Sequence, residues 1–141
     1  MKQTGILAVL TAMILVAGAV CVPAQAGIIG QNDEQVRAIA EPIMDTILEG
    51  LNRGDYLQYS RDFDMTLKEA ITRDRFADIQ KDINAQFGEY LFREYLGFLN
   101  REAFTIVLWK GVFGKTKDEV LIKLVISERN GRYQVTGLWY Q

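Results

Sequence analysis

The residues best suited to acid–base chemistry are Asp62 and Asp64, which flank Phe63 where a short helix is expected to end. A carboxylate desolvated by neighbouring aromatic rings can have a raised pKa and act as a general base. Aspartate is also frequent in turns and helix caps for purely local reasons. The pair therefore has two interpretations, a general base or a capping turn, and the second is the commoner use of such a pattern.

Aromatic residues and one lysine are the candidates for a ligand pocket. Tyrosine hydroxyls can orient a ligand inside an apolar cavity, although aromatic clusters also pack in cores with their polar tips at the rim. The predicted pocket residues are Tyr56, Tyr59, Phe63, Phe87, Tyr95, Trp109, Lys110 and Trp139.

Lys110 interrupts an otherwise apolar strand face. If that face points inward, Lys110 is a buried cation that can bind an anionic ligand or pair with Asp62, Asp64 or Glu94. If the face points outward, the side chain reaches water. Both orientations are open from the sequence, whereas Arg93 and Lys123 are expected to face solvent.

The sequence contains no histidine, and its single cysteine is Cys21. Histidine is the commonest general base and the commonest metal ligand. Without it, acid–base chemistry depends on Asp, Glu, Tyr or Lys, and any metal site would use oxygen ligands alone. No Gly-x-Ser-x-Gly elbow is present. We expect no metal site and no cofactor, and an enzyme only as the weaker alternative.

The first 26 residues are typical of a secretory signal peptide. Lys2 precedes an apolar stretch from Gly5 to Val20, and Pro23-Ala24-Gln25-Ala26 ends in an A-x-A pattern. An uncleaved anchor helix and lipidation at Cys21 are lesser alternatives. Cleavage after Ala26 would leave 115 residues as one domain, 27–141, outside the cytoplasm, secreted or periplasmic, and free of the membrane.

Charge patterning limits the partners. The chain has 16 Lys and Arg against 18 Asp and Glu, and both signs are mixed along it. Nucleic-acid binding needs clustered positive charge, so we expect no nucleic-acid partner. A small apolar or anionic ligand and a second copy of the chain remain as expected partners.

Three full helices are predicted before the sheet. Asn32 and Gln35 match a capping box ahead of an apolar stripe that ends at Gly54, with Pro42 expected to kink or break it. A short aromatic helix follows Asp55, and a turn or two at 67–71 is capped by Thr66. Thr72 caps the last helix, 73–87. The residues from Gly27 to Gln31 are expected to form a mobile lead-in.

Four strands follow without intervening helices. The first covers 90–99 and is expected to be either partly covered on both faces or bent at Gly97. The others are Phe104–Phe113, Val120–Ser127 and Arg132–Tyr140, joined by short polar links. This order predicts the α+β class: three N-terminal helices packed on a curved, mainly antiparallel four-stranded sheet.

The chain resembles the nuclear transport factor 2-like superfamily, a cone fold that includes ketosteroid isomerases and polyketide cyclases. The segments that carry the resemblance are 50–56, 60–64, 87–90, 107–110 and 137–140. It is similar above all to small exported domains without an assigned function. The resemblance implies a pocket between helices and sheet and often a sheet-to-sheet dimer, but no enzyme's catalytic set matches this chain.

Three functions follow, in decreasing order of weight. The first is a non-enzymatic module that binds a small, partly apolar ligand in the pocket. The second is a structural domain that pairs with itself or a partner through the sheet face. The third is a lyase or isomerase of the ketosteroid isomerase type, with Asp62 or Asp64 as base and Tyr59 or Tyr95 as donor.

Overall fold

The computed structural model describes residues 25–141. The expectations for the apolar leader and for Cys21 lie outside the described residues. Over the described part, the chain is an α+β fold with one open sheet.

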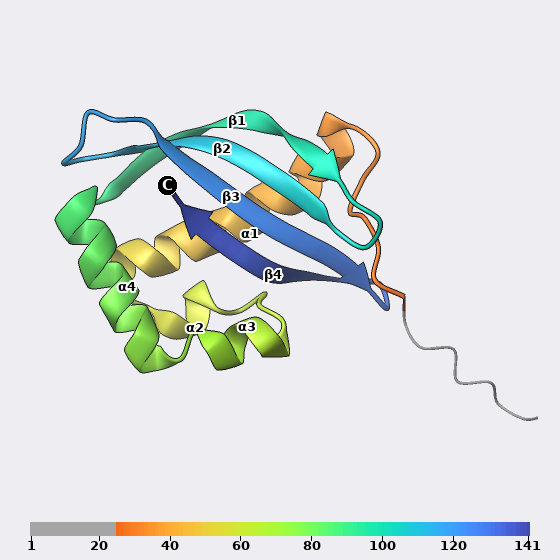
Figure 1. Cartoon of the computed structure of the whole chain (residues 1–141), viewed down its shortest axis with the longest axis horizontal. Coiled ribbons are helices and arrows are strands. Elements are labelled where there is room, and N and C mark those ends of the chain that lie inside the picture. The colour runs from red at the N-terminus through yellow and green to blue at the C-terminus, as the bar shows by residue number, and fades with distance from the viewer. Residues whose placement is uncertain (1–24) are drawn as a thin grey trace, which may run out of the picture.

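The sheet is an antiparallel meander. Strands β1 (Tyr90–Asn100), β2 (Thr105–Phe113), β3 (Val120–Arg129) and β4 (Arg132–Tyr140) lie side by side in chain order (Figure 1). A two-residue turn joins β3 to β4, because Asn130 and Gly131 both take the positive φ that such tight hairpins require. These strands confirm the predicted meander and its bounds to within two residues.

One face of the sheet is the core face. Along β2 every second residue from Thr105 to Phe113 is buried, and β3 contributes Val120, Ile122, Leu124 and Ile126 to the same face. The aliphatic face of β3 is therefore part of the core. Irregular register at Tyr95/Gly97 in β1 and at Val125/Ile126 beside β4 bends the outer strands.

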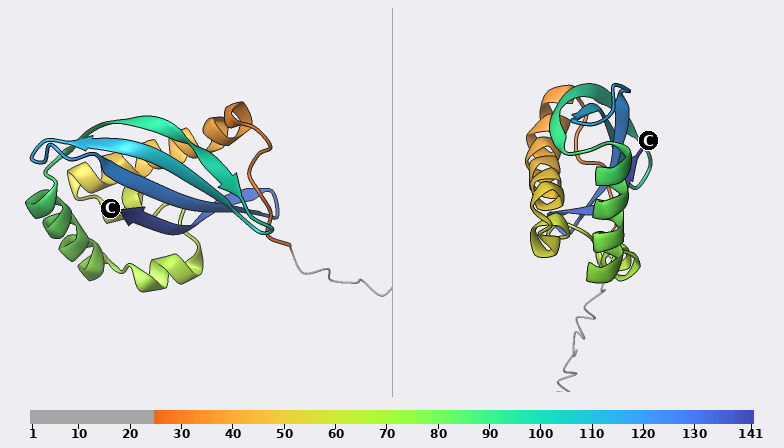
Figure 2. Two further views of the ribbon diagram at one scale, coloured as in Figure 1. Left: turned by 45° about the horizontal axis from the view of Figure 1, so that its top comes forward. Right: turned by 90° about the vertical axis from the view of Figure 1, so that its left-hand side faces the viewer.

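Four helical segments precede the sheet, not three. Helix α1 (Asp33–Arg53) runs along the core face, while α2 (Tyr56–Tyr59), α3 (Met65–Ala70) and α4 (Arg73–Gln86) lie beyond the β4 edge (Figures 1 and 2). The count differs because the segment predicted as one or two turns at 67–71 is the short helix α3.

Helix α1 passes through Pro42 without a break. The sequence predicted a kink or a break there, and the break was wrong. Proline removes one backbone donor and costs about 3 kcal/mol inside a helix. Burying the α1 side chains on the sheet offsets that cost; the buried apolar residues are Val36, Ala40, Ile43, Met44, Ile47, Leu48 and Leu51.

Side-chain caps set where the short helices begin. Asp55 Oδ1 accepts from Gln58 N at 3.1 Å, and Thr72 Oγ1 accepts from Arg75 N at 3.3 Å, as predicted. Asp64 Oδ1 accepts from Leu67 N at 2.8 Å, so α3 starts at Met65. The predicted cap at Thr66 was wrong, because Asp64 reaches the free N–H groups first.

The segment before α1 is part of the sheet structure. Gly27 and Glu128 exchange two backbone hydrogen bonds of 2.9 Å, and the buried Ile29 donates its N–H to Thr105 Oγ1 at 3.1 Å. The predicted mobile lead-in was wrong, because Ile29 adds an apolar side chain to the core.

A second segment closes the opposite edge of the sheet. Phe63 bridges Val135 in parallel: Val135 N donates to Asp62 O at 2.7 Å, and Asp64 N donates to Val135 O at 2.9 Å. The bridge anchors the link between α2 and α3 to β4.

Gly50 allows α1 and α2 to meet. A Cβ at this position would lie 2.5 Å from Tyr59 N and 2.8 Å from its Cα. These are backbone atoms, which cannot rotate away. Because Tyr59 is almost fully buried, the contact also fixes where its ring lies.

We expect Gly50→Ala to destabilise the fold by about 1–3 kcal/mol, although alanine alone would favour the helix by about 1 kcal/mol. Urea unfolding followed by circular dichroism measures the difference. Asn84→Ala, at an exposed position of α4, is the control and should change little. A Gly50→Ala protein as stable as the parent would contradict the close approach.

Candidate functional site

A pocket of about 250 Å³ lies between α4 and the end of β4. Its walls are apolar over most of their extent, and Asp82 and Gln86 stand at the exposed rim. The lining residues are Tyr59, Ile71, Ile79, Asp82, Ile83, Gln86, Phe87, Leu138, Trp139 and Tyr140.

Alternation along β4 aims its last residues at this pocket. Leu138 pairs with Leu124 and Tyr140 pairs with Ile122, and both partners belong to the core face. Trp139, between them, points to the other side, where Lys123 Nζ lies 4.4 Å from the centre of its ring. The strand thus sends a phenol and an isobutyl group inward and keeps the indole of Trp139 on the other face, so that Trp139 borders the pocket only at its margin.

Helix α4 supplies the facing wall. Its inner face consists of residues at helical spacing, of which Phe76 and Ile83 are buried and Ile79 and Phe87 partly buried. The helix ends at Gln86, where Phe87 N and Gly88 N both bond to Ile83 O. Phe87 then packs its ring 5.7 Å from that of Phe113 and closes one end of the pocket.

The Tyr140 hydroxyl is the one buried side-chain polar atom in the described residues that has no hydrogen-bond partner. Tyr59 lies close enough to influence its pKa, but no hydrogen bond of acceptable geometry joins the two hydroxyls. A buried polar group left unpaired costs about 1–3 kcal/mol. The fold therefore keeps, in a residue that borders the pocket, a buried donor without a partner, at a cost to stability.

Both phenols stay protonated at neutral pH. Burial raises the pKa of Tyr140 well above its usual value, and the neighbouring Tyr59 adds to the effect. Burial likewise raises the pKa of Tyr59, with the Tyr140 hydroxyl partly opposing it. Each hydroxyl can therefore donate a hydrogen bond to a neutral acceptor such as a carbonyl, ether or hydroxyl oxygen.

The charges around the pocket disfavour an anion. Asp82 is the one charged residue in the lining, and no lysine or arginine contributes to it. A carboxylate or phosphate would enter without a cation to balance it, which is costly in an apolar site. The arrangement suits a small neutral molecule with an oxygen at its inner end.

The structure brings only part of the predicted site together. Tyr59, Phe87 and Trp139 line the pocket. Tyr56 and Phe63 pack behind it: the Tyr56 hydroxyl donates to Ile71 O at 2.8 Å, and the Phe63 ring lies 5.2 Å from that of Tyr59. Tyr95, Trp109 and Lys110 lie elsewhere on the sheet.

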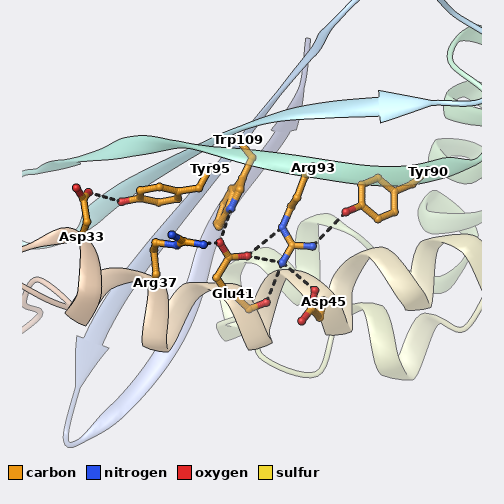
Figure 3. Close-up of polar contacts among 8 residues, drawn as sticks. All are labelled: Asp33, Arg37, Glu41, Asp45, Tyr90, Arg93, Tyr95 and Trp109. Carbon is orange, nitrogen blue, oxygen red and sulfur yellow. Dashed lines mark hydrogen bonds and ion pairs between the residues drawn. The ribbon is translucent and has the colours of Figure 1, made fainter.

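Tyr95 and Trp109 belong to a polar cluster between α1 and the first two strands (Figure 3). Glu41 accepts from Trp109 Nε1 at 3.2 Å and from Arg93 Nε at 3.2 Å. Arg93 also donates to Asp45 at 2.8 Å, and Tyr95 donates to Asp33 at 2.8 Å. These groups bond to one another, which leaves little for a ligand.

The sequence predicted that Arg93 faces solvent, and this prediction was wrong. Its side chain is only 10% exposed and points at α1. Burial alone would lower the pKa of Arg93, but its hydrogen bonds to Asp45, Tyr90 and Glu41 outweigh burial and raise it. The guanidinium therefore remains charged and acts as a bridge between α1 and β1.

Lys110 lies on the outer face of the sheet. Its ammonium is 3.2 Å from Glu94 Oε2 and 3.1 Å from Glu119 Oε1. Hydrogen bonds to Glu119 and Glu94 raise the pKa of Lys110. Of the two orientations left open by the sequence, the structure has the outward one, and Lys110 does not reach the pocket.

Asp62 and Asp64 do not line the pocket between α4 and β4, which is called the Tyr140 pocket from here on. Asp62 pairs with Arg61, with Nη2 and Oδ2 2.9 Å apart, and Asp64 caps α3. Their role as a base stays a prediction, and their observed contacts are those of a capping turn.

A larger groove of about 450 Å³ beside Asp62 runs between α1 and the start of β4. It contains no unpartnered buried polar atom and is the weaker candidate.

Sequence reasoning missed Tyr140 and the apolar wall formed by Ile71, Ile79 and Leu138. Strand alternation could have found Tyr140, because Tyr140 lies two residues after Leu138 and so shares its face of the strand. Both residues pair with the aliphatic face of β3. Nothing local could show that its hydroxyl lacks a partner, since that depends on every neighbouring element.

The described residues contain no group of three or more potential metal ligands, and none of their helices is long and apolar enough to cross a membrane. Comparison of the chain with protein-family models, curated proteins and solved structures found no match. The resemblance to the nuclear transport factor 2-like superfamily therefore stays a prediction.

We expect stability to fall as pH rises above about 10. The unfolded phenols lose their protons near pH 10, whereas burial keeps Tyr59 and Tyr140 protonated in the folded chain. For each phenol that stays protonated in the folded chain but is ionised in the unfolded chain, the unfolding free energy falls by about 1.4 kcal/mol per pH unit. Tyr140→Phe should flatten this decline, measured by urea unfolding from pH 8 to 11.5.

Tyr133→Phe is the matched control, because Tyr133 is exposed and lies outside the pocket. Equal alkaline slopes for the parent and for Tyr140→Phe would contradict the buried, protonated phenol.

Proposed function

We propose that this chain is an exported, non-enzymatic module that binds a small, neutral, mostly apolar molecule in the Tyr140 pocket. The proposal includes a nuclear transport factor 2-like cone packing of the helices on the sheet and an extracytoplasmic location after cleavage near Ala26. The observation that carries the binding function is the buried Tyr140 hydroxyl without a partner, in the wall of an apolar pocket.

Energetics support a ligand that carries an acceptor. A molecule that accepts from Tyr140 would recover the cost of the unpaired hydroxyl and bury apolar surface against Ile79, Ile83 and Leu138. The pocket is slightly smaller than the usual range of about 300–1,000 Å³ for ligand sites. A compact ligand therefore fits better than an extended one.

The chemistry of the lining gives less support to an enzyme. A ketosteroid isomerase-type reaction needs a carboxylate and a phenol near one cavity point. Asp62 lines the separate groove beside α1, where it pairs with Arg61, and Asp64 caps α3. Asp82 stands at the exposed rim of the Tyr140 pocket. The pocket thus has phenol donors but no carboxylate positioned beside them as a base, which fits binding better than proton abstraction.

Native mass spectrometry of the protein, purified without denaturation from cells that export it, tests the proposal. We expect a retained molecule of a few hundred daltons. Tyr140→Phe should lower its occupancy by roughly tenfold, the effect of losing one hydrogen bond of about 1.4 kcal/mol. Tyr133→Phe should retain the ligand like the parent. Equal retention in Tyr140→Phe would contradict the role of the hydroxyl.

Ligand-free protein gives a second measurement. After unfolding, dialysis and refolding, Tyr140→Phe should be at least as stable as the parent, because it removes a buried polar group that has no partner. A clear loss of stability would show instead that the hydroxyl has a structural partner.

A second candidate function is self-association through the outer face of the sheet. Leu96 is 54% exposed there, beside the exposed Phe92 and Leu99. Two lysines, Lys110 and Lys123, and two glutamates, Glu94 and Glu119, balance in charge near this face. An apolar face without net charge fits a second copy better than a strongly charged partner.

We expect the parent to sediment as a dimer and Leu96→Lys to sediment as a monomer in analytical ultracentrifugation. Leu57→Lys is the control: Leu57 is 69% exposed but lies on α2, away from the sheet face. A parent that remains monomeric at about 100 μM, a hundredfold above a 1 μM dissociation constant, would rule out the pairing.

A further inference from the structure

The first tie between the described N-terminal segment and the rest of the fold is at Gly27. Gly27 is the first described residue to bond to another element, through two backbone hydrogen bonds with Glu128. Two residues later, Ile29 enters the core and bonds to Thr105, whose hydroxyl donates to Asn100 Oδ1 at 2.7 Å. Asn100 in turn donates to Gly30 O at 2.9 Å. Residues 27–30 are thus tied to the β1–β2 turn and to β3.

The sequence places a cleavage pattern at the same point. Ala24-Gln25-Ala26 has small residues at the two positions that a signal peptidase reads, and the next residue is Gly27. The last residue of the pattern is therefore adjacent to the first described residue that bonds to another element. The sequence pattern and the hydrogen bonds are independent observations.

Glu128 places a backbone oxygen and a side-chain oxygen near Gly27. Its carbonyl oxygen accepts from Gly27 N at 2.9 Å. Its carboxylate lies alongside: Oε2 is 3.8 Å from the point that a Cβ on Gly27 would occupy. An ammonium group at Gly27 could keep the first hydrogen bond and direct a second proton at the carboxylate, a charge-assisted contact.

We propose that the Ala26–Gly27 peptide bond is a processing site and that Glu128 binds the α-ammonium group that cleavage creates. Hydrolysis adds one water: Ala26 gains the carboxylate, and Gly27 gains an amine that takes up a proton. This inference rests on the export part of the proposed function and is independent of the ligand.

The same bonds set the order of events. In the folded chain, the N–H and C=O of Gly27 are both occupied by Glu128, so a protease cannot hold the residue after the cut in an extended strand of its own. Cleavage therefore precedes closure of the N-terminal segment, and the new ammonium group docks on Glu128 as the domain folds.

Intact-mass measurement of the exported full chain tests the position. We expect a mature chain that begins at Gly27. A mature chain that begins at another residue would overturn this inference and leave export standing. A chain that stays in the cytoplasm with Met1 retained would overturn both.

A stability cycle tests the role of Glu128. Glu128→Gln is made in two forms, one beginning at Gly27 and one at Ala24, where an amide replaces the ammonium group. We expect Glu128→Gln to lower the unfolding temperature by about 2–5 °C more in the Gly27 form than in the Ala24 form. The substitution affects the hydrogen bond from Gly131 N to Glu128 Oε1 equally in both forms, so its contribution cancels in the comparison.

Glu69→Gln is the control, because Glu69 is exposed on α3, away from the N-terminal segment. Equal effects of Glu128→Gln in the two forms would overturn the binding of the ammonium group. A folded precursor cleaved by signal peptidase as fast as an unfolded one would overturn the order of events.

Discussion

The contact between Arg93 and Glu41 fixes how the helical layer sits on the sheet. Apolar burial draws α1 onto the core face, but it is not directional and leaves the helix free to slide. Arg93 on β1 is 10% exposed, and leaving its charge unpaired would cost several kcal/mol. Glu41 satisfies Arg93 and also accepts from Trp109 on β2, so one helix position is tied to two strands. The ends of α1, and with them the placement of α2 through Gly50, follow from this register.

The two regions of buried polar groups differ in one respect that matters for function. At the α1–β1 cluster the hydrogen bonds close on themselves: Tyr95 bonds to Asp33, and Arg93 bonds to Glu41, Asp45 and Tyr90. In the pocket, the Tyr140 hydroxyl has apolar neighbours and one phenol in poor geometry. Folding alone would favour phenylalanine at position 140. A donor kept at a cost to stability is the feature expected of a binding site, where fold and function compete.

Local sequence signals predicted the parts of the fold that local physics decides. The caps at Asn32, Asp55 and Thr72 are set by near neighbours, and the structure has them. The site was harder to predict, because it depends on which way each face points. Lys110 and Trp109 are adjacent, yet one meets glutamates outside and the other meets Glu41 inside. Likewise, Arg93 looked solvent-facing because the sequence does not show that α1 carries Glu41 and Asp45 opposite it.

Both edges of the sheet near the β3–β4 turn are closed by segments from outside the meander. Gly27 covers the free edge of β3 beyond the start of β2, and Phe63 covers the edge of β4 at Val135. Exposed edges invite pairing with other chains, so these short bridges limit strand addition at that end. The outer face, with Phe92, Leu96 and Leu99, also remains open. Association through a sheet face buries side chains, whereas association through a sheet edge forms backbone hydrogen bonds. Any self-association through this face should therefore depend on its apolar side chains and weaken with a single lysine substitution.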